Sequence, residues 1–350
     1  MADPIRVALL GYGLAGRLFH APFIDAVPDL ELRAIVTSNP QRQSEASAEY
    51  PDAELLDSAE DVFARAADFG AVVVATANIA HVPQATAALA AGLHVVVDKP
   101  LAADAQRAQE LDAAATTAGR QLHVFQNRRY DSDFRTLRRL IEAGELGSVY
   151  RFESRFERWR PDPGHAWRDQ ADPEQMGGVL YDLGAHLVDQ ALQLFGPVSS
   201  VDAALRNRRV AAGPDDDTSV SLEHANGTIS DLWMSSLAAH QGPRFRVLGS
   251  RGAFVVEGLD AQEAALKSGQ RPAANPQGWG IEPEERVAML FPEGTPVPLD
   301  RGDYRDFYRD LVASLRGQSD PAVTVAEATQ ALTVMDAARA SSRTGRRVHI

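Results

Sequence analysis

The chain has 350 residues, of which 45% are hydrophobic and 24% are charged, and its net charge is -13. This length suggests two domains, each large enough to bury its own core. The acidic balance argues against nucleic acid or an anionic membrane as the main partner, because both need a basic surface. Cysteine is absent, which excludes disulfides, a thiolate nucleophile and Cys-ligated metals. The start lacks the features of a signal peptide and no apolar run approaches a membrane span, so we expect a cytoplasmic protein.

A glycine-rich turn follows the first apolar run. Residues 5–10 lead into Gly11-Tyr-Gly13-Leu-Ala-Gly16, and an amphipathic segment continues to about residue 26. In a dinucleotide-binding turn of this spacing, the glycines permit a tight turn, close approach of the backbone to the pyrophosphate, and close packing of helix on strand. We therefore expect five residues to contact a nicotinamide dinucleotide: Gly11, Gly13, Leu14, Ala15 and Gly16.

Alternating strand and helix signals follow this turn. Strands are predicted at residues 30–36, 71–75, 94–97 and 122–125, and alanine-rich helices at 82–91 and 104–118. Such alternation is typical of an open parallel sheet. A glycine turn that only joined a strand to a helix would leave this pattern without a ligand to explain it.

The end of the second strand bears on the choice of cofactor. An acid there would bind the ribose hydroxyls of NAD, whereas basic and small polar residues admit the 2'-phosphate of NADP. The sequence reads Val36-Thr-Ser38-Asn39-Pro-Gln-Arg42, without an acid. Ser38 can donate to a phosphate and Arg42 can pair with it, so we expect NADP, with NAD possible. Alternatively, Ser38 and Asn39 cap the next helix and Arg42 is solvated.

Polar residues also follow the later strands. Open α/β sheets place ligands at the carboxyl ends of their strands, so Thr76, Asn78 and His81 are expected to line the cofactor site. The strand at 94–97 runs directly into Asp98-Lys99-Pro100. There Asp98 is expected beside the cofactor, and Lys99 near the nicotinamide, where it can donate to a substrate oxygen. The alternative is a surface lysine paired with Asp98.

The pattern changes after residue 126, which divides the chain into domains at 1–126 and 127–350. A helix is predicted at 132–143, and the two-residue periodicity predicts strands at 149–157, 201–206, 218–222, 228–234 and 245–248. Asn226-Gly227 is a hairpin signal. These features are typical of a large antiparallel sheet. Residues 272–298 are rich in Gly and Pro and are predicted to be irregular, and helices are expected at 304–315 and 325–340.

The loop at residues 158–168 is rich in arginine and tryptophan. Its side chains Arg160, Trp167 and Arg168 can recognise a polar ligand that is sugar-like or carries a carboxylate. The alternative is a surface loop pinned by its tryptophans.

A candidate proton-transfer group lies after Gly177-Gly178. Asp182, His186 and Asp189 are spaced i, i+4, i+7, so in a helix all three project from one face. A histidine beside a carboxylate can act as an acid or a base. Alternatively, Asp182 offsets the helix dipole and His186 is a core histidine. A metal site with Asp189 or His165 as a further ligand is the third reading, but nothing else offers ligand spacing, so we expect no metal.

Three motifs together resemble the glucose-fructose oxidoreductase, inositol dehydrogenase and MocA (Gfo/Idh/MocA) family. They are Gly11-x-Gly13-x-x-Gly16, Asp98-Lys99-Pro100, and Gly177-Gly178 followed by Asp182-x-x-x-His186. The resemblance covers nearly the whole chain. The stretches at 11–22, 127–131 and 181–190 look like the branch that contains NADP-dependent scyllo-inositol dehydrogenases.

The resemblance implies an α/β Rossmann domain followed by an α+β domain with a large, mostly antiparallel sheet, whose open face forms a homodimer or homotetramer. It matches Lys99 to the lysine of the family's Glu-Lys-Pro motif and His186 to its catalytic histidine, with Asp182 as the accompanying acid. The sequence departs from the pattern at Asp98, where the family has Glu, and at Ala77, where it has Pro.

The expected function is hydride transfer between a secondary alcohol of a cyclic polyol or sugar and a nicotinamide. Lys99, Asp182 and His186 would be catalytic and also contact the substrate, together with Arg160, Trp167, Arg168 and Tyr181. Alternatives are a related aldose, dihydrodiol or keto-sugar dehydrogenase, or an NADP-sensing regulator without catalysis. The presence of Lys99, Asp182 and His186 argues against a sensor, because a sensor needs no proton relay.

Overall fold

The computed structural model of the chain describes residues 3–162, 175–209 and 213–350, and its strands form two sheets. The first sheet is parallel throughout, in the order β3-β2-β1-β4-β5-β6. Its strands are β1 (Ile5–Leu10), β2 (Leu30–Val36), β3 (Glu54–Leu56), β4 (Ala71–Val74), β5 (His94–Asp98) and β6 (Leu122–Phe125). The central strands are buried on both sides, which explains their unbroken apolar runs. The order reverses between β1 and β4, which creates a ligand-binding crevice at their carboxyl ends.

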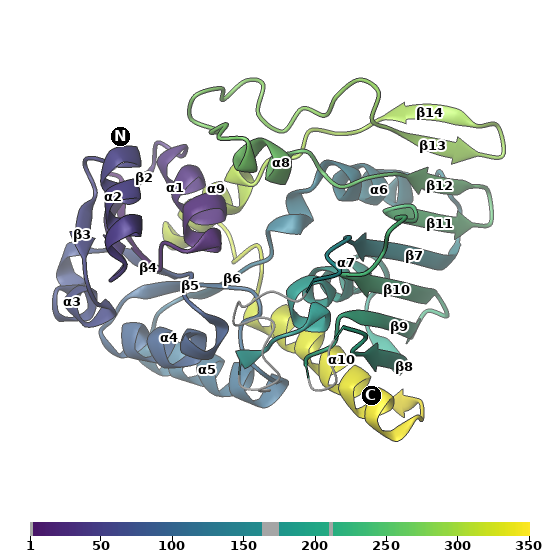
Figure 1. Cartoon of the computed structure of the whole chain (residues 1–350), viewed down its shortest axis with the longest axis horizontal. Helices are drawn as coiled ribbons and strands as arrows, with labels where there is room; N and C mark the ends of the chain where they lie inside the picture. The colour runs from purple at the N-terminus through teal and green to yellow at the C-terminus, as the bar shows by residue number, and fades with distance from the viewer. Residues whose placement is uncertain (1–2, 163–174, 210–212) are drawn as a thin grey trace.

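Helices cover both faces of this sheet (Figure 1). They are α1 (Ala21–Asp25), α2 (Pro40–Glu49), α3 (Ala59–Ala64), α4 (His81–Ala90) and α5 (Ala105–Ala118). The segment after the glycine turn begins as a π-helical turn, Gly16–His20, before α1. At the start of α2 the side chain of Asn39 caps the helix by accepting from the backbone N–H of Arg42.

The second sheet has nine strands in the order β14-β13-β12-β11-β7-β10-β9-β8-β15. Only β7 and β10 pair in parallel among these strands, so the sheet is mostly antiparallel, as predicted. The strands are β7 (Val149–Glu157), β8 (Val198–Arg206), β9 (Asp217–His224), β10 (Ile229–Ser235), β11 (Phe245–Gly249), β12 (Ala253–Val256), β13 (Val287–Phe291), β14 (Thr295–Pro298) and β15 (Val348–His349). The prediction of an irregular segment at 272–298 was wrong at its end, because β13 and β14 pair there as an edge hairpin that tolerates proline.

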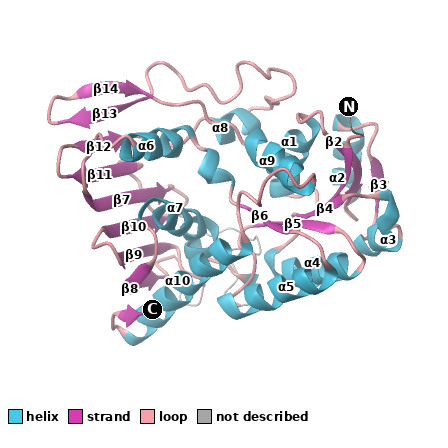
Figure 2. Ribbon diagram, turned by 180° about the vertical axis from the view of Figure 1, so that it is seen from behind, coloured by secondary structure: helices cyan, strands magenta, loops and turns pink. Residues whose placement is uncertain are grey.

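Helices of the second half lie along one face of this sheet and also join the two halves (Figure 2). They are α6 (Ser132–Glu142), α7 (Ala185–Phe195), α8 (Gln262–Lys267), α9 (Arg305–Leu315) and α10 (Val325–Thr344). α7 packs on β7 and β10, whereas α9 packs against α1 and α10 against α5. In the part of the chain that the structure describes, no helix is both long and apolar enough to cross a membrane.

The opposite face of the nine-stranded sheet is polar. Burial alternates along β9 and β10, and the partly exposed side chains form ion pairs across strands, such as Arg151 with Asp231 at 2.7 Å and Arg246 with Glu153 at 2.5 Å. Such pairs fit a solvated or polar contact surface. Self-association through this face stays a prediction.

A buried ion pair holds α7 against the turn that follows the first sheet. The guanidinium of Arg129 donates to both carboxylate oxygens of Asp189, at 2.6 and 2.8 Å, and both side chains are buried. Arg129 also donates to the carbonyl of Ala322 and to Glu327. Asp189 therefore faces the interior and connects α7 to the segment before α10.

We expect Asp189→Asn to lower the free energy of unfolding by about 3–5 kcal/mol, because it leaves the buried guanidinium only the longer, partly exposed ion pair with Glu327. Urea unfolding followed by circular dichroism measures the change. Glu142→Gln, which removes an exposed pair with Arg138, is the matched control and should cost less than about 0.5 kcal/mol. Equal effects of the two variants would contradict the role assigned to the buried pair.

Candidate active site

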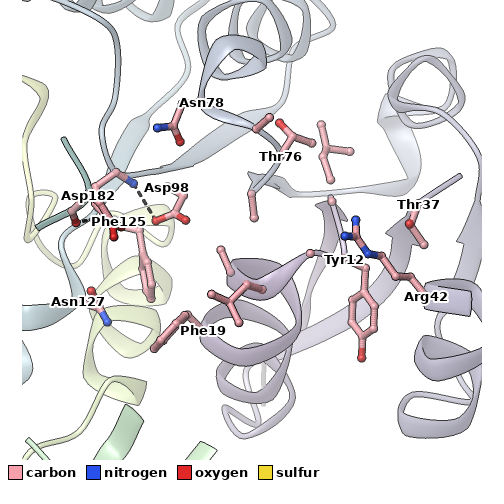
Figure 3. Close-up of a pocket in the computed structure, with 18 of the residues that line it drawn as sticks. Tyr12, Phe19, Thr37, Arg42, Thr76, Asn78, Asp98, Phe125, Asn127 and Asp182 are labelled. Carbon is pink, nitrogen blue, oxygen red and sulfur yellow. Dashed lines mark hydrogen bonds and ion pairs between the residues drawn. The ribbon is translucent and has the colours of Figure 1, made fainter. Parts of the chain in front are cut away.

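A cavity of about 920 Å³ lies at the carboxyl ends of the parallel strands and extends to the second half of the chain. Figure 3 shows Tyr12 and Arg42 toward one end of it, and Asp98 and Asp182 toward the other. The first end is built by the glycine turn and the ends of β2 and β3. The second is built by the end of β5, by β7 and by the π-helical turn before α7.

The glycine turn has the shape that a dinucleotide requires. Gly11 has φ +95°, and a Cβ there would lie 2.7 Å from the carbonyl oxygen of Ala75; a Cβ on Gly16 would lie 1.9 Å from the oxygen of Gly11. At Gly13 the nearest atom to such a Cβ is Nη1 of Arg42, at 3.9 Å, so this glycine opens into the cavity. Leu14 and Ala15 also line the cavity, whereas Gly16 is buried in the packing of the turn. The turn therefore fits the backbone cradle of a dinucleotide pyrophosphate.

Ser38 and Arg42 both line the same end of the cavity. Asn39, rather than Ser38, caps α2, which leaves the Ser38 hydroxyl available to a ligand. A carboxylate also lines this end of the cavity. Asp57, which follows β3, accepts a hydrogen bond from Gln43 at 2.7 Å. The sequence analysis of cofactor choice rests only on the end of β2. β3 has only three residues, so its pattern is too short to predict that Asp57 reaches the same site.

Thr76 and Asn78 line the cavity, but His81 does not. The His81 ring is fully buried, with Nδ1 2.9 Å from the carbonyl oxygen of Pro100 and Nε2 3.3 Å from that of Thr76. Burial lowers its pKa. His81 thus fixes the loop after Lys99 instead of contacting a ligand directly.

The side chain of Lys99 reaches across to the second half of the chain. Its Nζ donates to the main-chain oxygen of Asp182 at 2.7 Å and lies 3.3 Å from Oδ1 of the same residue. Asp98 instead accepts the backbone N–H of Lys99, at 2.8 Å. Lys99 is therefore a largely buried cation of the cavity wall, and the alternative of a surface lysine paired with Asp98 does not describe it.

Asp98 lies near a buried histidine, His20, which belongs to the family-like stretch at 11–22 but is not among the expected site residues. Nε2 of His20 lies 3.8 Å from Oδ2 of Asp98, and its Nδ1 lies 2.6 Å from the hydroxyl of Tyr308 on α9. Burial acts against the ionised carboxylate, but His20 and Lys99 outweigh it and lower the pKa of Asp98. The shorter side chain found here in place of the family's Glu is thus ionised and points to the first helix.

Asp182 and His186 both line the cavity, as expected for two residues on one face. Asp182 lies in the π-helical turn Leu180–Gly184, and His186 lies at the start of α7. Nδ1 of His186 is buried without a hydrogen-bond partner, so the Asp182 carboxylate does not orient it through that nitrogen. Asp189 leaves this face altogether and pairs with Arg129.

The surroundings of His186 keep its imidazole neutral. Burial, followed by the charges of Lys99, Arg128, Arg244 and Arg158, lowers its pKa well below the ordinary value of 6.5. The charges that act on the ring are cations, which disfavour its protonated form.

Of the expected substrate contacts, Arg160 lines the cavity, whereas Tyr181 does not. The Tyr181 hydroxyl donates to the carbonyl of Ala103 at 2.7 Å and accepts from Arg339, so it holds the loop after Lys99. Trp167, Arg168 and the alternative metal ligand His165 lie outside the described residues. Within the described ranges, no three His, Cys, Asp or Glu residues are arranged to hold a metal ion.

Besides Asp57, five charged residues that the sequence did not single out as ligand contacts line the cavity: Glu60, Arg128, Arg158, Glu263 and Lys267. Glu263 and Lys267 come from α8, in a segment without a recognisable motif. Although burial raises it, Arg128, Lys267 and Arg158 hold the pKa of Glu263 at about 2. The chain contains only two lysines, Lys99 and Lys267, and both line this cavity.

A parallel sheet with a glycine turn at its switch point, and a lysine and a neutral histidine further along the cavity, define the class of nicotinamide-dependent oxidoreductases. Comparison of the sequence with protein-family models agrees with this class. Residues 5–126 match the oxidoreductase family with an NAD-binding Rossmann fold, and residues 134–255 match the Gfo/Idh/MocA C-terminal domain. The chain belongs to the Gfo/Idh/MocA family and is an NAD(P)-binding oxidoreductase.

Similar proteins cover the whole chain. The oxidoreductase YdgJ of Escherichia coli is 38% identical over 344 residues, which is 96% of each protein. The scyllo-inositol 2-dehydrogenase (NADP(+)) IolW of Bacillus subtilis is 32% identical, covering 99% of this chain and 96% of that one. The solved structure of the oxidoreductase yvaA from Bacillus subtilis superposes with a TM-score of 0.91 at 32% identity, over 99% of both chains.

The low pKa of His186 predicts a dependence of stability on pH. The unfolded chain binds a proton at this histidine near pH 6.5, whereas the folded protein binds it only at lower pH. In that window the unfolded state holds more protons, so the free energy of unfolding falls as the pH drops below 6.5. His186→Gln removes this contribution, and the variant should lose less stability than the wild type between about pH 7.5 and about pH 5.5.

Urea titrations of both proteins at the two pH values measure this difference. The other buried histidines contribute equally to the two proteins and cancel in the comparison. The same loss in variant and wild type would show that the folded protein protonates His186 as readily as the unfolded chain does.

Proposed function

We propose that the protein is an NADP-preferring dehydrogenase that interconverts a secondary alcohol of a cyclic polyol or sugar, scyllo-inositol-like, with the corresponding ketone. The observation that carries the proposal is the pairing of Lys99 with a neutral His186 in one cavity. The similarity to IolW, which is named for NADP and scyllo-inositol, supports both the cofactor and the substrate class.

Lys99 is suited to hold the oxygen of the reacting alcohol. An ammonium has three N–H donors, and Nζ directs its close contacts to the main-chain oxygen and Oδ1 of Asp182. A remaining N–H can donate to a substrate oxygen and stabilise the negative charge that develops on it. Asp182 therefore positions the ammonium from the opposite side of the cavity.

His186 is suited to move the hydroxyl proton. During oxidation the neutral imidazole accepts this proton, and during reduction the protonated ring returns it. Its low pKa makes the protonated ring a strong donor, so the same group serves the reductive direction. A bound nicotinamide supplies the acceptor for the hydride that leaves the carbinol carbon. Oxidation thus transfers one hydride and releases one proton, and the C–O single bond becomes a carbonyl.

Initial rates with NADP and with NAD, across scyllo-inositol, myo-inositol and common aldoses, test the proposal. Turnover of an inositol or aldose with NADP is the expected result. Tight binding of NADPH without turnover of any of these compounds would favour a cofactor sensor instead.

Replacing either reacting group should lower turnover while leaving cofactor binding intact. We expect Lys99→Met and His186→Ala each to reduce kcat by about 10²- to 10⁴-fold, with little change in the Kd for NADPH measured by fluorescence titration. His240→Asn, in an exposed loop outside the cavity, is the control and should keep full activity. Unchanged kcat in both cavity variants would reject this mechanism.

Two variants test the cofactor preference in opposite directions. Arg42→Ala should raise KM for NADP by about 10- to 100-fold, because a charge-assisted contact to the 2'-phosphate is lost, and should affect NAD much less. Asp57→Asn should mainly raise KM for NAD, because a carboxylate binds the free ribose hydroxyls that NAD carries. Steady-state kinetics with both cofactors separate the two effects. Equal changes for NADP and NAD in the Arg42 variant would assign that arginine to folding rather than to the phosphate.

A further inference from the structure

One arginine in the cavity has donors that the described residues do not satisfy. Arg158 follows β7, and its side chain is only 20% exposed. Its Nη1 lies 3.5 Å from Oδ2 of Asp182, and its Nη2 lies 3.8 Å from Oε1 of Glu263. Within residues 3–162, 175–209 and 213–350, the guanidinium makes these two ion pairs but no hydrogen bond, although it carries five N–H donors.

The neighbouring carboxylate is held in place without Arg158. Oε2 of Glu263 accepts a short hydrogen bond from Arg128, and Oε1 accepts one from Lys267 at 2.5 Å. The ring of Phe156 contacts the guanidiniums of both Arg128 and Arg158, whose central carbons are 4.5 and 4.7 Å from its centroid. This stacking orients the plane of Arg158, so its free N–H groups lie in a fixed place on the cavity wall.

Donors and acceptors alternate along this wall. Lys99 is followed by Asp182, then Arg158, then Glu263, then Lys267, and each lies within 3.8 Å of the next. A hydroxyl group both donates and accepts, so two adjacent hydroxyls can each bridge the guanidinium and a carboxylate. A carboxylate or phosphate can only accept, and it would meet the carboxylates of Asp182 and Glu263 within 4 Å of the same guanidinium.

We propose that Arg158 and Glu263 form a specificity subsite that binds a pair of adjacent hydroxyl groups on a neutral substrate. The subsite deepens the proposed function and rests on it. Because Asp182 contacts both Lys99 and Arg158, the bound hydroxyl pair lies beside the hydroxyl that reacts at Lys99 and His186. The substrate is thus recognised as a neutral polyol, and acidic sugars and sugar phosphates are disfavoured.

The test uses the full-length protein saturated with NADP and three probes: scyllo-inositol, a deoxyinositol that lacks one of its hydroxyls, and glucuronate. Arg158→Met removes the donors but keeps an apolar stem over Phe156, and Glu263→Gln removes the charge of the acceptor. Arg155→Met, at the end of the preceding strand β7 and stacked on Trp233 outside the cavity, is the matched control. The Kd for NADPH and the thermal midpoint of each variant report on folding.

Arg158→Met should raise KM for scyllo-inositol by about 10- to 100-fold, as expected when hydrogen bonds to a charged group are lost, and should change kcat and the Kd for NADPH much less. In the wild type, KM should be higher for the deoxyinositol than for scyllo-inositol. This difference should shrink in Arg158→Met, because the variant no longer binds the hydroxyl that the deoxyinositol lacks. Glu263→Gln should relax the discrimination against glucuronate. If Arg158→Met fails to fold, the discrimination against glucuronate in Glu263→Gln tests the subsite by itself.

Other outcomes would overturn the subsite. Suppose that the wild type turns over normally but Arg158→Met changes neither KM for scyllo-inositol nor the difference in KM between scyllo-inositol and the deoxyinositol. This result would reject the subsite without contradicting the proposed function. A wild type that prefers glucuronate would show that the wall selects an anion. A wild type that oxidises neither inositol nor any other neutral polyol or sugar would end both the proposed function and the subsite.

Discussion

The contact on which the site depends joins an ammonium to a main-chain carbonyl of the other half of the chain. Nζ of Lys99, at the end of β5, donates to the oxygen of Asp182 in the π-helical turn before α7. A buried ammonium needs such acceptors, because its desolvation is costly. The surrounding residues hold both ends of this contact. His20 faces the acid that precedes Lys99, while His81 and Tyr181 fix the loop that follows it. Lys99 therefore links the carboxyl end of β5 to the turn before α7.

An excess of positive charge around His186 follows from the same arrangement. Lys99 and Arg158 lie on either side of the Asp182 carboxylate, and the Glu263 carboxylate forms ion pairs with Arg128 and Lys267. Cations surround His186, which disfavours a proton on the imidazole and favours negative charge on a nearby oxygen. In the proposed mechanism, the same electrostatic field prepares the proton acceptor and stabilises the product of proton removal.

The parts of the molecule that depend on local sequence could be predicted from it. The glycine turn, the parallel strands, the mostly antiparallel second sheet and the lysine at the end of β5 all carry short-range patterns. The failures have long-range causes. Asp189 pairs with Arg129, which is 60 residues away in the sequence, and helical periodicity does not reveal such a partner. Glu263 reaches the cavity only because the chain crosses back over it after β12, and no pattern within α8 indicates this.

The placement of lysine has a practical consequence for chemistry done on the protein. Among 35 basic residues only two are lysines, and both line the cavity, so reagents that acylate or reductively alkylate side-chain amines find their targets only there. Coupling the enzyme to a support through lysine would therefore block the cavity itself. Cysteine is absent, so one cysteine introduced on the outer face of the nine-stranded sheet would provide a unique thiol. Immobilisation or dye attachment through that thiol would leave the cavity open.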